Sequence, residues 1–176
     1  MLVGRFQPFH RGHLHAVRYA LDAADRLLLG IGSSNRSREP ENPFTAAERR
    51  SMVLDSLDAE ARRRVAIHDI PDVQNHVRWI GMIRETLPGF DAVFTNDKIT
   101  TRLYRREGMP VRPIPFLDRP SLSGTAVRGR MSAGLPWEDL VPAGTARTVR
   151  RVAGTGWPSG VDPPGSGSAA GGPRTL

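Results

Sequence analysis

Strand-length apolar runs alternate with helix-length segments along most of this 176-residue chain, and no other sequence feature limits its possible folds as strongly. Residues 26–32 (RLLLGIG) form a compact apolar run, as expected of a parallel strand covered on both faces. The other predicted strands are 2–4, 65–70, 91–95 and 111–116. The predicted helices are 13–24, 45–57, 77–87, 99–107, 123–131, 137–141 and 146–152. This order predicts an α/β fold, a Rossmann-like doubly wound parallel sheet of about five strands.

The last part of the chain has a different composition. Residues 154–176 are rich in Gly, Pro and Ser and contain few apolar side chains. Such a segment cannot bury enough apolar surface to offset the entropy lost on folding. We therefore expect one domain over residues 1–153, followed by a disordered tail.

Composition excludes several classes of protein. Without cysteine, the chain has no disulfide, no thiolate metal site and no cysteine nucleophile. No apolar run approaches the roughly 20 residues that a membrane helix needs. The first residues, MLVG, also lack the basic and apolar regions of a signal peptide. We expect a cytoplasmic protein with no membrane partner.

The formal net charge of +7 raises the question of nucleic acid binding. Lys98 is the only lysine, however, and the arginines are scattered instead of forming a basic run interleaved with aromatics. This bias is typical of GC-rich coding, and an anionic small-molecule substrate accounts for surplus positive charge equally well. We therefore expect no nucleic acid partner.

The first motif is GRFQPFHRGH, residues 4–13, which joins the first predicted strand to the first predicted helix. The N–H groups at a helix N-terminus favour an anion, and Gly12 allows a phosphate to approach the backbone closely. His10 and His13 can donate hydrogen bonds to phosphate oxygens, and Arg5 can add a bidentate contact. Alternatively, both histidines cap the helix or pack in the core. Phe6 and Gln7 of the same motif are further nucleotide-binding candidates.

The second motif is LSGTAVR, residues 122–128, after the last predicted strand. Ser123, Gly124 and Thr125 place hydroxyls and backbone amides at a helix start, and Arg128 adds a permanent charge one turn later. This set suits the β- and γ-phosphates of a nucleotide. Taken alone, the motif is equally that of an ordinary serine-capped helix. Because ligands in such sheets bind at the carboxyl ends of the strands, we expect the two motifs to meet there.

Three segments in order, GRFQPFHRGH, NPFTAAER (42–49) and SGTAVRGRM (123–131), resemble the archaeal-type nicotinamide-nucleotide adenylyltransferases of the HxGH nucleotidyltransferase superfamily. The resemblance implies a fold of nucleotidyltransferase type and transfer of AMP from ATP to nicotinamide mononucleotide, with release of pyrophosphate. His10 and His13 would contact the α-phosphate, while Arg5, Ser123, Thr125 and Arg128 would hold the triphosphate. Mg²⁺ would accompany the nucleotide, with no metal ligand assigned in the protein. Family members are often oligomeric, so a homo-oligomer is expected by analogy.

The acceptor region departs from that family. Trp79 matches the tryptophan that packs against the nicotinamide ring, although one aromatic on an amphipathic helix is more often a core residue. Asparagine is usual three residues earlier, where this chain has His76 with Asn75 beside it. We take Trp79, His76 and Asn75 as acceptor-binding candidates. Asp69 and Asp72 either belong to the site or merely end a strand.

Residues 95–98 (TNDK) replace a Ser-Gly-Asn-Pro stretch of the family, near the nucleobase. Three hypotheses remain open at this point. The first is the adenylyltransferase. The second is a CTP-dependent cytidylyltransferase acting on a small phosphate or phosphonate such as phosphonoformate. The third is a non-catalytic nucleotide-binding or nucleic-acid-associated protein.

Overall fold

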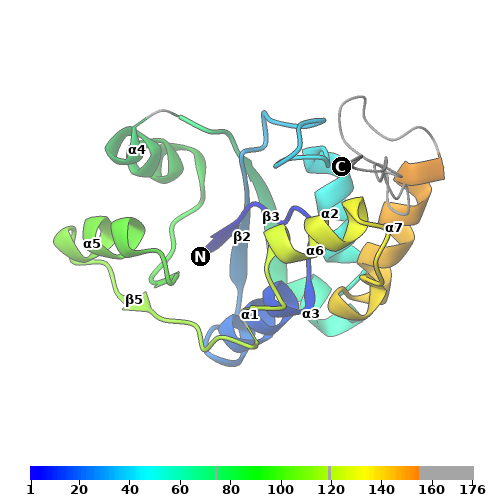
Figure 1. Ribbon diagram of the computed structural model, residues 1–176. Coiled ribbons are helices and arrows are strands. Elements are labelled where there is room, and N and C mark those ends of the chain that lie inside the picture. The colour runs from blue at the N-terminus through cyan, green and yellow to red at the C-terminus, as the bar shows by residue number, and fades with distance from the viewer. Residues whose placement is uncertain (74, 119, 155–176) are drawn as a thin grey trace.

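The parallel sheet expected from the sequence is present in the computed structural model, which describes residues 1–73, 75–118 and 120–154 (Figure 1). Its order is β3-β2-β1-β4-β5, and every pair is parallel. The strands are β1 (Leu2–Gly4), β2 (Leu27–Gly32), β3 (Val65–Ile70), β4 (Val93–Phe94) and β5 (Val111–Arg112). The strand order reverses between β1 and β4, and ligands of such sheets bind at that switch point.

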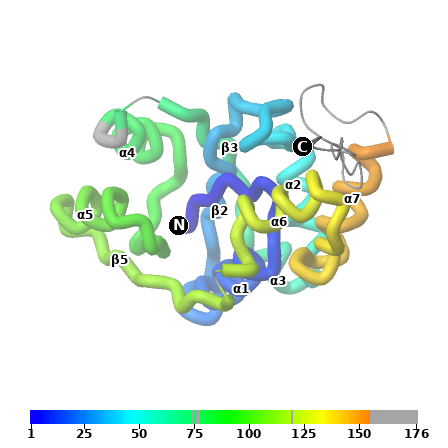
Figure 2. Tube along the Cα trace, viewed as in Figure 1, coloured from blue at the N-terminus to red at the C-terminus, as the bar shows by residue number. Residues whose placement is uncertain are grey.

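Helices cover both faces of the sheet (Figures 1 and 2). α4 and α5 lie on one side, and α1, α2, α3, α6 and α7 lie on the other. Their bounds are α1 (Arg11–Asp22), α2 (Ala46–Leu54), α3 (Ala59–Arg64), α4 (His76–Thr86), α5 (Lys98–Arg106), α6 (Gly124–Ser132), the 3₁₀ turn η1 (Glu138–Leu140) and α7 (Ala143–Gly154). The doubly wound fold is therefore confirmed.

Each face of the sheet has its own apolar core. Leu27, Leu29 and Ile31 alternate along β2 and are fully buried in the larger cluster, which also includes side chains of α1, α2, α6 and α7. Ile80, Ile83 and Tyr104 of α4 and α5 belong to the second cluster. Among the described residues, no helix combines the length and apolar character needed to cross a bilayer.

Some element bounds differ from the prediction for local reasons. The helix expected over 45–57 ends at Leu54, and Asp58 starts α3 by accepting a hydrogen bond from the Ala61 N–H at 2.8 Å. The strand expected over 111–116 pairs only at its first two residues. Pro113 and Pro115 lack the N–H donors that a longer ladder requires. The helix expected over 137–141 is the 3₁₀ turn η1.

Candidate active site

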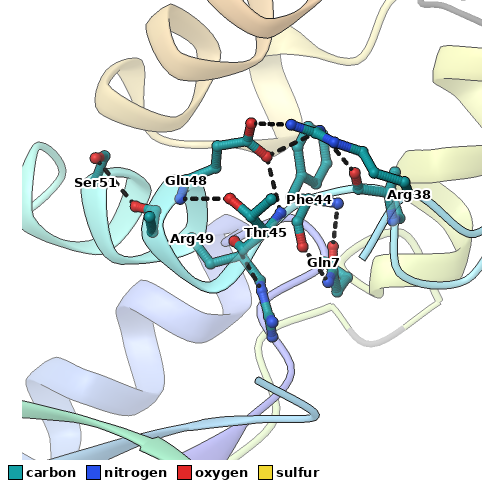
Figure 3. Close-up of polar contacts among 9 residues, drawn as sticks. Gln7, Arg38, Phe44, Thr45, Glu48, Arg49 and Ser51 are labelled. Carbon is teal, nitrogen blue, oxygen red and sulfur yellow. Dashed lines mark hydrogen bonds and ion pairs between the residues drawn. The ribbon is translucent and has the colours of Figure 1, made fainter. Parts of the chain in front are cut away.

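The turn between β1 and α1 carries the first motif, and part of that motif is buried. Phe6 has a positive φ of 51°, and its ring packs edge-on against Phe9 and His13. Gln7 donates from its amide nitrogen to the Phe44 carbonyl (2.9 Å) and accepts from the Phe44 N–H (3.0 Å), as Figure 3 shows. The structure thus places both side chains inside the protein, where they brace the turn.

His10 and His13 cap α1 reciprocally. Nδ1 of His10 accepts from the His13 N–H (3.3 Å), and Nδ1 of His13 accepts from the His10 N–H (3.2 Å). The two rings stack with centroids 3.6 Å apart. An imidazole that accepts at Nδ1 is neutral and carries its proton on Nε2. The cap therefore selects the tautomer and leaves Nε2–H as the ring donor of each histidine.

Burial keeps both imidazoles neutral. It lowers the pKa of His10 to about 4. The pKa of His13 lies well below its ordinary value, first because of burial and then because of the neighbouring His10, with a hydrogen bond to the Pro8 backbone acting in the opposite direction. Near neutral pH both histidines are hydrogen-bond donors without charge.

Gly12 allows the His10 ring and the Leu122 backbone to lie close to the start of α1. A Cβ at Gly12 would lie 3.1 Å from Cε1 and Nδ1 of His10 and 3.3 Å from the Leu122 carbonyl oxygen. The lack of a side chain therefore lets the His10 ring and the segment that leads into α6 pack over the start of α1.

The second motif meets the first, as the sequence predicts. Ser123 caps α6 by accepting from the Ala126 N–H at 3.2 Å. Arg128 Nη1 donates to the Gln7 carbonyl (2.8 Å), and Nη2 lies 3.5 Å from Thr125 Oγ1. A Cβ at Gly124 would lie only 3.1 Å from the same Gln7 carbonyl oxygen. The N-termini of α1 and α6 therefore converge at the carboxyl end of β1.

Arg5 adds a second guanidinium to this edge. Its side chain is half exposed and forms a 3.7 Å ion pair with Glu41. The pKa of Arg128 is lowered, chiefly by burial and next by the charge of Arg5. Because the charge of Arg5 acts on Arg128, an anion bound here would relieve the repulsion between the two cations.

A cavity of about 530 Å³ opens beside this edge. Arg5, Ser33, Asp72 and Trp79 contribute to its lining, together with Met1, Val3, Gly4, Gly32, Val73, Val93, Phe94, Thr95, Asp97 and Thr100. It therefore spans the carboxyl ends of β1, β2 and β4 and reaches α4. Its size suits a small-molecule ligand.

The predicted acceptor residues occupy different positions. Trp79 lines the cavity and also packs against the core below α4. Asn75 accepts from the Arg78 N–H at 3.3 Å and so helps to start α4. His76 is the first residue of α4, and its side chain lies outside the described part of the structure.

In the stretch after β4, Asn96 and Asp97 form hydrogen bonds to nearby backbone groups. Asn96 donates to the Ile114 carbonyl (2.8 Å) and accepts from the Ile114 N–H (3.0 Å). Asp97 caps α5 by accepting from the Thr100 N–H at 2.7 Å, and it also lines the cavity. Asn96 thus replaces the β4–β5 ladder where Pro113 and Pro115 interrupt it.

The two aspartates that the sequence cannot rank are separated by the structure. Asp72 lines the cavity and accepts from the Ser33 hydroxyl at 2.8 Å. Asp69 pairs with Arg50 at 2.9 Å and is absent from the cavity lining.

Arg49, which lies in the NPFTAAER motif, received no role from the sequence. It is fully buried, and its own motif was the only signal that could have drawn attention to it.

A parallel sheet with two motif-bearing helix N-termini at its switch point defines a Rossmann-like α/β protein of the nucleotide-binding class. The cytidylyltransferase-like family model matches residues 1–130, and the chain belongs to this family of nucleotidyltransferases.

Several relatives and solved structures are similar to this chain. The nicotinamide-nucleotide adenylyltransferase of Pyrococcus furiosus is 36% identical over 157 residues, covering 88% of this chain and 84% of the relative. That of Thermoplasma acidophilum is 37% identical, covering 87% and 86%. A bifunctional NMN adenylyltransferase/ADP ribose pyrophosphatase from Francisella tularensis, complexed with AMP and a manganese ion, superposes with a TM-score of 0.73 at 19% identity. The superposition covers 86% of this chain and 48% of that one, so this chain spans about half of the bifunctional protein.

Proposed function

We propose that the protein transfers AMP from ATP to nicotinamide mononucleotide and releases pyrophosphate. The observation that carries this proposal is the convergence of α1 and α6, where Arg128 Nη1 lies 2.8 Å from the Gln7 carbonyl of the turn that ends in His10. Two helix N-termini, two imidazoles and two guanidiniums at one edge suit a triphosphate. The names of the curated relatives support the choice of ATP and nicotinamide mononucleotide.

The α-phosphate is assigned to the start of α1. There the Nε2–H groups of His10 and His13 would donate to its oxygens as neutral donors, and the His13 donor would exchange the Pro8 backbone for the phosphate. Ser123, Gly124 and Thr125 at the start of α6 would hold the β- and γ-phosphates, with Arg5 and Arg128 supplying charge. Gly12 would act indirectly, because its lack of a side chain lets the His10 ring pack over the start of α1.

The reaction needs little proton transfer. An oxygen of the acceptor phosphate, already anionic near neutral pH, attacks the α-phosphorus as the bond to the pyrophosphate oxygen breaks. The electron pair of that bond leaves with pyrophosphate, so no general base is required. Catalysis then consists of in-line positioning and stabilisation of the negative charge that crowds the α-phosphoryl group.

The acceptor is assigned to the side of the 530 Å³ cavity that Trp79 lines, and the donor base to the side that Thr95 and Asp97 line. Trp79 offers an aromatic face to a pyridinium ring, an arrangement favoured by dispersion and by cation–π attraction. Asn75 and His76 lie at the start of the same helix, α4, and are proposed as its polar partners. Phe6 and Gln7 take part indirectly, since their buried side chains fix the turn that presents His10.

Mg²⁺ fits this arrangement as a companion of the nucleotide. The described residues include no group of three or more histidine or acidic side chains that could hold a metal ion. Mg²⁺ commonly binds substrate phosphates and water with few protein ligands, so the triphosphate oxygens would supply most of its coordination. When bound, the ion would neutralise charge on the leaving pyrophosphate.

We expect the enzyme to act in the cytoplasm, and light scattering will establish whether it is a homo-oligomer.

A second candidate is favoured by the stretch at residues 95–98, which departs from the adenylyltransferase pattern. Thr95 and Asp97 line the cavity, and the Asn96 side chain is bound to Ile114. Residues 95–98 (TNDK) contain neither the glycine nor the proline of the family stretch, so the backbone of this wall differs. This change suits a donor with another base. The alternative is CTP-dependent transfer of CMP to a small phosphate or phosphonate such as phosphonoformate.

A pyrophosphate-release matrix tests both candidates. ATP, CTP, GTP and UTP are each combined with nicotinamide mononucleotide and with several small phosphonates in the presence of Mg²⁺. Release only from ATP with nicotinamide mononucleotide supports the proposal. Release only from CTP refutes it in favour of the second candidate, and no release with any pair contradicts both.

A further inference from the structure

We propose that Arg49 is a positioning residue for nucleotidyl transfer, because its buried guanidinium holds the turns after β1 and β2 in the shape that forms the cavity wall. The inference rests on the proposed function and adds a residue that touches neither substrate in that proposal. Arg49 lies on α2 and is fully buried, although arginine is among the residues least often found inside proteins.

The Arg49 guanidinium is bound entirely by backbone carbonyls. Nη1 donates to the carbonyls of Arg5 (2.8 Å) and Gly32 (2.7 Å), and Nη2 donates to that of Ser33 (3.1 Å). Nε donates to the Thr45 carbonyl (3.2 Å) of its own helix start, which appears in Figure 3. None of the ion pairs found within the described residues includes Arg49. A planar fork of fixed donors is therefore used to tie two separate strand ends together.

The bound carbonyls belong to turns with unfavourable backbone conformations. Phe6, which follows the Arg5 carbonyl, and Ser33 both have φ of 51°, a region that residues with a Cβ seldom adopt. Such conformations persist only where the surrounding contacts enforce them, and they concentrate at functional sites. Arg49 supplies hydrogen bonds on both turns at once.

These turns form part of the cavity wall. Arg5, Gly32 and Ser33 line the cavity, whereas Arg49 does not. The Ser33 hydroxyl in turn donates to Asp72, another lining residue. A shift of the two turns would therefore move the Arg5 guanidinium and the Ser33–Asp72 pair together. Arg49 acts on the reaction only through these residues.

The test compares Arg49→Gln and Arg49→Lys with Arg50→Gln. Arg50 is the matched control, since it lies next in α2 and donates to the Ile67 carbonyl (3.0 Å) and to Asp69 (2.9 Å), outside the cavity lining. Val149→Ala, in the core of α7, controls for lost stability alone. For each variant kcat, KM and Tm are measured, and hydrogen exchange is followed in residues 4–9 and 31–36.

We expect Arg49→Gln to lower kcat by about 100-fold, more than it raises either KM, since misplaced groups cost most in the transition state. Arg49→Lys should recover part of kcat because lysine keeps the charge but not the planar fork. Exchange should quicken in both segments in Arg49→Gln and stay unchanged in Arg50→Gln. Wild-type kcat in Arg49→Gln, or an equal loss in Val149→Ala at matched Tm, overturns the inference.

The exchange measurement separates this inference from the proposed function. If the wild-type protein releases no pyrophosphate with any substrate pair, the proposed function fails. Arg49→Gln still tests the positioning of the turns in that case, because exchange needs no substrate. Unchanged exchange in both segments would then overturn the role of Arg49 as well.

Discussion

At the level of single residues, His10 combines two tasks that one substitution can separate. Its Nδ1 caps α1, and its Nε2–H is the proposed phosphate donor. Asparagine is a good N-cap but cannot replace the Nε2–H. A loss of activity without a loss of helix stability would therefore identify the donor role.

We expect His10→Asn to keep Tm near the wild-type value and to lower kcat by about 100-fold or more, the cost of losing one preorganised donor. Steady-state pyrophosphate release and thermal unfolding measure the two effects. His15→Asn, on the same helix and outside both motifs, is the control and should keep full activity. Wild-type kcat in His10→Asn would contradict the role assigned to the imidazole.

The buried imidazoles also predict how stability depends on pH. The folded-state pKa of His10 is about 4, below the ordinary value of 6.5, so the unfolded chain binds more protons between these values. The contribution of neutral His10 to the free energy of unfolding is complete above pH 6.5. It is lost as the pH falls from 6.5 through 4, and the total loss is about 3 kcal/mol. Urea unfolding at several pH values should show this slope.

The matched measurement for the pH dependence is His10→Asn, because carboxylates titrate in the same range in both proteins. The difference in unfolding free energy between the two proteins isolates the histidine contribution. That difference should change between pH 6.5 and 4 and stay constant above 7. A difference that is independent of pH would show that His10 is not kept neutral by burial.

At the level of elements, Gly144 allows α7 to approach the end of α2 closely. A Cβ at Gly144 would lie 2.3 Å from the backbone carbonyl group of Asp55, which directly follows α2. Backbone cannot give way as a flexible side chain can, so the two segments would have to separate. This contact supports the helix that carries Arg49.

Gly144→Ala should therefore destabilise the protein by roughly 1–3 kcal/mol, as overpacking does. Gly129→Ala in α6 is the control, because nothing lies within 4 Å of its Cβ position. Replacing a helical glycine with alanine in open space should stabilise by about 0.5–1 kcal/mol. Urea unfolding curves of both variants measure the effects, and equal stability of the two would refute the packing argument.

At the level of the whole molecule, α7 is the last helix of the described residues and ends at Gly154. The tail expected over residues 154–176 lies, apart from Gly154, outside the described residues. We propose that the domain is complete without it, given its Gly-, Pro- and Ser-rich composition. The helix itself packs through buried side chains such as Val149 and Val152.

A chain truncated after Gly154 should keep kcat, KM and Tm close to those of the full chain. A second truncation after Val141 removes α7 and serves as the comparison, since it deletes part of the larger core. We expect that variant to fail to fold, as measured by circular dichroism. A tenfold loss of kcat in the Gly154 truncation would place a functional element in residues 155–176.

Apart from α3, which was not predicted, the sequence alone determined the order of strands and helices, the parallel sheet and the meeting of the two motifs at its carboxyl edge. These features follow from local patterns: apolar runs of strand length, helical spacing and caps. The capping box of Thr45 and Glu48 is an example, and both of its hydrogen bonds are present (3.2 and 2.8 Å). Partners three residues apart are visible in a sequence.

Only the tertiary structure decided which polar side chains of the motifs turn inward. Gln7 is paired with Phe44, 37 residues away, and Arg49 binds the Arg5 carbonyl, 44 residues away. A buried polar group is tolerated where its partners are supplied, and partners so distant in sequence leave no local pattern. The sequence therefore located the proposed phosphate-binding edge, and the packing of distant turns decided which of its polar residues are buried and hold the others in place.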